Sequence, residues 1–76
     1  MEPESVVKPS FDVEMFTRRL RLLRESKGIS QEELAARAGL DRSYISLVER
    51  GRRSPTVNTL IKISTVLAVE VREFFE

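Results

Sequence analysis

Residues 29–51 read ISQEELAARAGLDRSYISLVERG, and they carry the start and stop signals of two short helices. Ser30 is followed three residues later by Glu33, the spacing of a capping box at the start of a helix. The helix is predicted over residues 31–38, where apolar and small side chains recur along one side. It ends at Gly39, because glycine adopts the left-handed backbone of a helix end without strain from a Cβ.

A second short helix follows almost at once. Asp41 caps it, it is predicted over residues 42–50, and Gly51 ends it. Two short helices joined through a glycine turn form a helix-turn-helix. The small side chains of Ala35 and Ala38 permit close approach of the two helices. This geometry directs the start of the second helix outward, where it can enter a DNA major groove.

The flanking sequence is also helical. Ser10 can cap a helix that runs to about Lys27, in which Val13, Phe16, Leu20 and Leu23 form an apolar stripe. Thr56 caps a helix over residues 57–67, and residues 71–75 form a short last helix. No stretch alternates like a strand. The fold class is therefore all-α, with five helices.

Composition argues against an enzyme. The 76 residues include no Cys and no His, which removes thiol nucleophiles, the commonest general base and the usual transition-metal ligands. Only three Gly are present, and they form no phosphate-binding loop. We expect no catalytic residues, no metal and no cofactor. Because so short a chain buries a modest core, a partner subunit would help to stabilise it.

The chain divides into an arm and a single domain. Residues 1–9 hold two of the three prolines and little to bury, so they are expected to form a flexible N-terminal arm. Residues 10–76 form the domain. The first residues do not resemble a signal peptide, and no apolar run reaches about 20 residues. We expect a cytoplasmic protein with no membrane contact and no small-molecule ligand.

The net charge of +1 conceals an uneven distribution. Basic residues exceed acidic ones in residues 17–27 and again in residues 41–53. Acidic residues exceed basic ones in the first sixteen and the last nine residues. The basic middle of the chain is therefore the part expected to meet a polyanion such as DNA.

Residues 29–51, with SPTVNTLIKISTVLAVEVREFF at 54–75, closely resemble the helix-turn-helix regulators of the Cro/C1, or Xre, family. The resemblance covers about residues 16–75 and implies a lambda-repressor-like fold. The runs LDRSYIS and ERG look most like the controller proteins of restriction–modification systems. The family consists of small dimeric regulators that bind palindromic operators in double-stranded DNA.

The resemblance implies which side chains face the bases: Arg42, Ser43, Tyr44, Ser46 and Leu47. Arg42 can offer two donors to guanine, and Leu47 can meet a thymine methyl group. Other interpretations stay open. Arg42 could be solvated or paired with Asp41, Tyr44 could cover Leu40, and Leu47 could be exposed or pack on a partner.

A second set is expected at the DNA backbone: Gln31, Arg50, Arg52, Arg53, Thr56 and Asn58. The resemblance implies that Gln31 binds a phosphate at the start of its helix, where free N–H groups favour an anion. The arginines lie in and just before the basic loop that follows the helix over residues 42–50. Contacts from such a loop to the phosphates can fix the position of the protein on DNA without reading its sequence. The alternative is an ordinary solvated loop.

The resemblance also implies a structural ion pair between Arg24 and Glu49. Three residues depart from the family pattern, namely Ala68 in place of a helix-ending glycine, Glu70 in place of a Ser or Thr cap, and Ser64 in place of a small apolar residue. Ser64 needs a hydrogen-bond partner, such as the carbonyl one turn back.

The C-terminal region is richer in apolar residues than one small core requires. We expect a dimer interface formed by Val66, Val69, Val71, Phe74 and Phe75. The alternative is that these side chains close the core under the first helix. The sequence thus predicts a homodimeric regulator of a restriction–modification operon that includes its own gene. Other hypotheses are a phage-type repressor, an antitoxin, or a protein-interaction module on the same fold.

Overall fold

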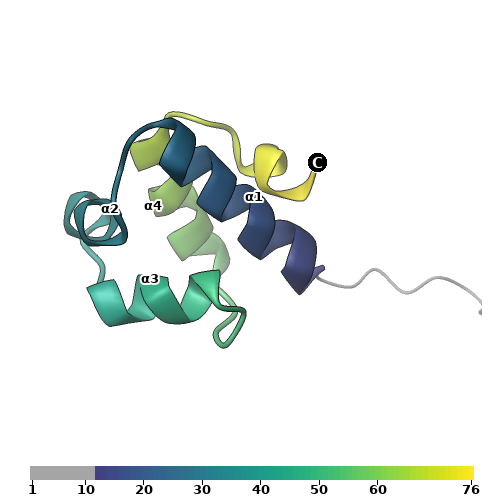
Figure 1. The fold of residues 1–76 in the computed structure, drawn as a ribbon, viewed down its shortest axis with the longest axis horizontal. Helices are drawn as coiled ribbons and strands as arrows, with labels where there is room; N and C mark the ends of the chain where they lie inside the picture. The colour runs from purple at the N-terminus through teal and green to yellow at the C-terminus, as the bar shows by residue number, and fades with distance from the viewer. Residues whose placement is uncertain (1–11) are drawn as a thin grey trace, which may run out of the picture.

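The computed structural model describes residues 12–76, and none of these residues forms a strand. The elements, in chain order, are α1 (Val13–Ser26), α2 (Gln31–Ala38), α3 (Arg42–Glu49), α4 (Val57–Leu67) and the 3₁₀ helix η1 (Val71–Phe75) (Figure 1). The all-α prediction is confirmed. Within this part of the chain, no helix is long and apolar enough to cross a membrane.

Two predicted helix bounds and one helix type differ from the structure. The N-terminal cap of α1 is Asp12, whereas the predicted cap, Ser10, lies outside the described residues, as does the predicted arm. Helix α3 ends at Glu49, one residue early, and Arg50 is its C-cap. The predicted fifth helix is a 3₁₀ helix, closed by a Glu73 N–H to Glu70 carbonyl hydrogen bond of 2.9 Å. So short a segment often adopts this tighter winding.

Each α-helix begins at a side chain that satisfies a backbone N–H of its first turn. The four capping residues, Asp12, Ser30, Asp41 and Thr56, accept from the N–H groups of Met15, Glu33, Ser43 and Thr59 at 2.7–3.1 Å. These N–H groups have no acceptor inside the helix. The caps therefore fix where the four α-helices start in a chain with short connections.

The core lies where α1, α2, α3, α4 and η1 converge. Its fully buried side chains come from every element: Phe16, Leu20, Leu34, Ile45, Val48, Ile63, Leu67 and Phe74. Helix α1 lies between α3 and η1 and contacts both (Figure 1). Of the predicted α1 stripe, Val13 is exposed instead, because it lies in the first turn at the edge of the core.

Helices α2 and α3 are joined by three residues, Gly39, Leu40 and Asp41. Gly39 has φ 69°, and the Leu40 N–H donates to the Ala35 carbonyl at 2.8 Å, which closes the end of α2. In Figure 1, α2 is viewed nearly end-on whereas α3 lies in the plane of the view. The two helices therefore cross steeply, and α3 lies along one side of the molecule.

Helix α4 ends at Ala68, which has φ 58°. The Val69 N–H donates to the Ser64 carbonyl at 3.0 Å, so the turn has the shape that glycine normally provides. The Ser64 hydroxyl donates to the Ile61 carbonyl at 2.9 Å, and the Glu70 N–H donates to the Glu73 carboxylate at 2.9 Å. The turn therefore forms despite the three departures from the family pattern. Of these three residues, only Ala68 has a strained backbone.

Replacing Ala68 with glycine should stabilise the fold. The left-handed backbone costs a residue with a Cβ about 1 kcal/mol, so Ala68→Gly should raise the free energy of unfolding by about that amount. Chemical denaturation measures the change. Ala36→Gly, at an exposed α2 position, is the control and should lower the free energy of unfolding by about 1 kcal/mol. Equal losses in both variants would contradict the assignment of strain to Ala68.

Candidate nucleic-acid interface

Helix α3 has a buried side and an outer side. Ile45, Val48 and Glu49 are buried, and they fix the rotation of the helix about its axis. The outer side forms a shallow depression lined by Arg42, Ser43, Ser46, Leu47 and Arg50. Four of the five residues predicted to face bases therefore share one surface, together with one of the predicted phosphate-binding arginines.

The first turn of α3 is held by Asp41. The hydroxyl and the backbone N–H of Ser43 both donate to the Asp41 carboxylate, and these hydrogen bonds lower the pKa of Asp41 below its ordinary value. Arg42 is exposed and has no hydrogen bond or ion pair within residues 12–76. The alternative of an Arg42–Asp41 pair is thus not what the structure shows, and the guanidinium donors of Arg42 are available to a ligand.

Tyr44 differs from its neighbours on α3. Its side chain is half-buried and packs against the hydrophobic core, as the side chain of Leu40 also does. The Arg53 guanidinium lies 5.4 Å from the centre of the Tyr44 ring, within cation–π range. Sequence patterns do not predict this contact, because it joins a loop residue to a helix and depends on the path of the loop between them. It holds one cation of the basic loop beside α3.

A buried ion pair joins α1 to α3. Both carboxylate oxygens of Glu49 accept from the Arg24 guanidinium, at 2.5 and 3.1 Å, and the side chain of Glu49 is fully buried. The hydrogen bond to Glu49 raises the pKa of Arg24 above its ordinary value. Arg24 also donates to the Ile29 carbonyl at 2.8 Å, which ties down the segment between α1 and α2.

Gln31, the first residue of α2, belongs to the same network. Its amide nitrogen donates to the Glu49 carboxylate at 2.9 Å. This bond fixes the direction of the side chain, and the second amide hydrogen has no acceptor within residues 12–76. A further arginine, Arg21, approaches the same carboxylate oxygen at 3.8 Å while its side chain remains 54% exposed. Sequence reasoning did not select Arg21 as a site residue.

The loop between α3 and α4 packs closely on α1. A Cβ at Gly51 would lie 3.0 Å from the Val13 side chain, so a larger residue at this position would crowd α1. Arg52 and Arg53 are exposed beyond it. At the start of α4, Thr56 uses its hydroxyl oxygen to cap the helix, and Asn58 is exposed. The predicted phosphate-binding residues thus lie at the starts of α2 and α4 and after α3.

The predicted dimer interface needs one correction. Phe74 is fully buried and packs edge-on against Phe16, with ring centres 5.6 Å apart. It therefore offers no surface to a second copy, because the core of its own chain covers it. Phe75 is 37% exposed, and Val66, Val69 and Val71 are half-buried. These four side chains keep apolar surface at the C-terminal end of the molecule.

Comparison with known proteins identifies similar chains. Residues 20–74 match the helix-turn-helix family HTH_3. The uncharacterized HTH-type transcriptional regulator y4dJ of Sinorhizobium fredii is 51% identical over 47 residues, which are 62% of this chain and 61% of y4dJ. The chain spans between 32% and 61% of the lengths of three such curated relatives.

Solved structures also resemble this fold. The restriction–modification controller protein C.AhdI of Aeromonas hydrophila superposes with a TM-score of 0.81 at 50% identity, over 84% of this chain and 97% of C.AhdI. SinR, described as a master regulator for biofilm formation and solved in complex with DNA, superposes with a TM-score of 0.76 at 37% identity. That match covers 80% of this chain and 98% of SinR.

Removing the carboxylate of Glu49 should destabilise the fold strongly. Glu49→Ala leaves Arg24 without its counter-ion in a buried position, and the expected loss is about 3–5 kcal/mol of unfolding free energy. Thermal or chemical denaturation measures it. Glu25→Ala, at an exposed position on α1, should change the stability by less than about 0.5 kcal/mol. A loss at Glu49 as small as that at Glu25 would show that the network does not hold the helices together.

Proposed function

This chain belongs to the helix-turn-helix family, and on that premise we propose that it is a sequence-specific transcriptional regulator that binds double-stranded DNA. Helices α2 and α3 are its helix-turn-helix, and α3 is the recognition helix. The observation that carries the proposal is the outer side of α3, where Arg42, Ser46 and Leu47 lie on an accessible surface while Ile45 and Val48 anchor the helix.

The proposed base contacts come from the outer surface of α3. The Arg42 side chain has no partner among residues 12–76 and lies in the first turn, the part of a recognition helix that enters the major groove. Ser43 holds its hydroxyl on Asp41, so its oxygen faces a base only as an acceptor or after rotation. Tyr44 is half-buried under Arg53, so its contribution is limited to its exposed edge.

The proposed backbone contacts surround this surface. Gln31 carries its free amide hydrogen at the start of α2, where N–H groups and the helix dipole favour a phosphate. The arginines after α3, Arg50, Arg52 and Arg53, supply charge on the other side. Thr56 and Asn58 stand at the start of α4. These contacts would position α3 without reading sequence.

We propose that the regulator acts as a homodimer on a palindromic operator. The half-exposed set Val66, Val69, Val71 and Phe75 is the proposed interface, without Phe74. Two-fold pairing through this end would present two α3 helices to successive major grooves, about 34 Å apart. Burial of the same apolar side chains would also stabilise so small a domain.

The proposed biological role is control of a restriction–modification operon, including the regulator's own gene, in the cytoplasm. The likeness to C.AhdI, a restriction–modification controller protein, supports this choice. The proposed domain comprises residues 10–76. The members of this family named above are transcriptional regulators rather than enzymes, and no catalytic role is proposed.

The DNA upstream of the protein's own gene tests the proposal. We expect the wild-type protein to protect a two-fold symmetric site there in a footprint with excess competitor DNA. Arg42→Ala should weaken binding to that site by about 1–3 kcal/mol, because a bidentate base contact is lost, and should relax preference at one base position. Selection from randomised sites measures the preference.

Arg72→Ala is the matched control, because it removes the same charge from exposed η1, away from α3. It should leave base preference unchanged. An Arg42→Ala variant with wild-type preference would remove Arg42 from the base-reading set. Failure of the dimeric wild-type protein to protect any site upstream of its gene would contradict control of that gene.

The dimer interface has its own test. Phe75→Glu places a charge in the proposed apolar contact and should shift the protein from dimer to monomer in analytical ultracentrifugation. Leu22→Glu is the control, because Leu22 is also a large, exposed apolar side chain (55% exposed) but lies on α1, outside the proposed interface. It should leave the dimer intact. Retention of the dimer in Phe75→Glu, with the fold intact by circular dichroism, would place the interface elsewhere.

A further inference from the structure

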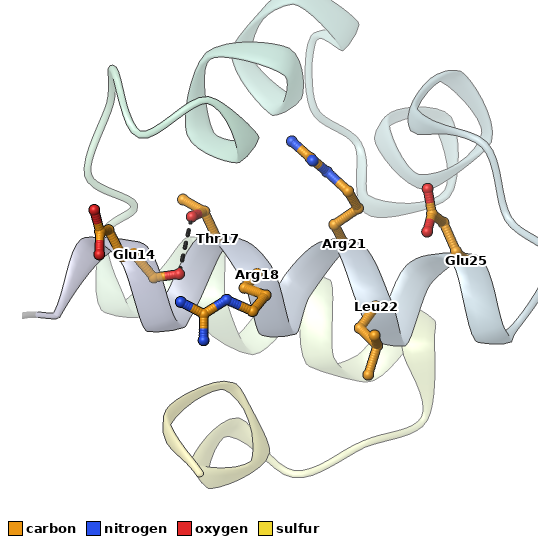
Figure 2. Close-up of a pocket in the computed structure, with 6 residues that line it drawn as sticks. All are labelled: Glu14, Thr17, Arg18, Arg21, Leu22 and Glu25. Atoms are coloured by element: carbon orange, nitrogen blue, oxygen red, sulfur yellow. Dashed lines mark hydrogen bonds between the residues drawn. The ribbon is translucent and has the colours of Figure 1, made fainter.

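Arg21 on α1 is a cation that the proposed DNA interface does not yet use. It lines a shallow depression on the outside of α1, whose lining residues are Glu14, Thr17, Arg18, Arg21, Leu22 and Glu25. Figure 2 shows the Arg21 side chain extending from α1 toward α2 and α3, whereas the Arg18 side chain does not point that way. Two arginines one turn apart on the same helix therefore face different surroundings.

The charge of Arg21 is not neutralised by its nearest carboxylate. Glu49 is already paired with Arg24 through both oxygens, and Arg21 approaches it only through Nε at 3.8 Å. Glu25 follows one turn later in the same depression, but no ion pair joins it to Arg21 within residues 12–76. Within residues 12–76 no hydrogen bond engages the terminal guanidinium nitrogens of Arg21, so their donors are available to a ligand beside the Glu49 carboxylate.

Arg21 lies between two groups of proposed phosphate contacts. Toward α2 it shares the Glu49 oxygen Oε1 with the amide of Gln31, so these two side chains are neighbours. One turn before Arg21 on α1, Thr17 lies close to the loop that follows α3. Its methyl group would be 3.9 Å from a Cβ at Gly51. Gly51 begins the stretch that carries Arg52 and Arg53. This side of α1 therefore lies between the start of α2 and the basic loop.

We infer that Arg21 binds the DNA backbone and shares one phosphate with Gln31. The inference rests on the proposed DNA binding and adds a contact from α1. In this arrangement Glu49 is a positioning residue, because a single buried carboxylate orients the Gln31 amide and steadies the Arg21 guanidinium. The phosphate would accept the free amide hydrogen of Gln31 and the terminal donors of Arg21, a charge-assisted contact.

The test compares Arg21→Ala with Arg18→Ala, since both remove one positive charge from exposed α1. Binding to a short duplex carrying the wild-type footprint is measured from about 50 to 200 mM salt, the range over which counterion release changes affinity steeply. Arg21→Ala should reduce the slope of log K against log salt by about 0.9, with affinity at 0.1 M salt falling on the order of tenfold. Arg18→Ala should leave the slope near that of the wild type.

Two further variants separate a shared phosphate from a general effect of charge or folding. Arg21→Lys should restore most of the slope, and thermal denaturation should show Arg21→Ala folded under the assay conditions. The double variant Arg21→Ala with Gln31→Ala should lose less affinity than the two single losses combined, because both side chains contact one group. Additive losses would overturn the shared phosphate.

The outcomes distinguish the role of Arg21 from the proposed DNA binding on which it rests. Wild-type protein that does not bind the duplex would contradict the proposed DNA binding itself. Wild-type binding with equal slopes for Arg21→Ala and the wild type would overturn the role of Arg21 alone. Equal reductions of the slope in Arg18→Ala and Arg21→Ala would also overturn it, because a net charge effect would then explain both.

Discussion

The burial of one carboxylate, that of Glu49, constrains most of this small fold. A buried charge is tolerated only when it is paired and its oxygens are hydrogen-bonded, and here the partners are Arg24 of α1 and Gln31 of α2. Three helices must therefore meet at one point with defined side-chain directions. A well-packed apolar cluster would give comparable stability but would supply no hydrogen bonds to direct the Arg24 and Gln31 side chains. The network thus links the placement of the recognition helix to the placement of the first residue of α2.

Local signals in the sequence were enough to predict the helices around this point. Ser30, Asp41 and Thr56 each cap the helix that was assigned to them, because capping depends on residues only two or three positions apart. The Arg24–Glu49 pair, which the family resemblance implied, is present in the structure. Four of the five residues that the resemblance implied would face the bases also lie together, on the side of α3 away from the buried Ile45 and Val48.

The features that the sequence did not predict depend on contacts between distant segments. The Arg53–Tyr44 contact needs the path of the loop, and the approach of Arg21 to Glu49 needs the packing of α1 on α3. Phe74 was assigned to a surface because apolar residues at the C-terminus exceeded what a small core was expected to hold. The structure places Phe74 inside that core, against Phe16, and Phe75 at its edge. Burial of adjacent aromatic residues depends on how η1 turns back onto α1.

The left-handed backbone at Ala68 has a consequence for the lifetime of the protein in a cell. A strain of about 1 kcal/mol multiplies the unfolded fraction of a marginally stable domain about fivefold. Proteases act on that fraction, so abundance responds to it. Ala68 lies at the junction of α4 and η1, apart from α3 and the basic loop. A single codon at this junction can therefore set how fast the protein is cleared while leaving every proposed DNA contact unchanged.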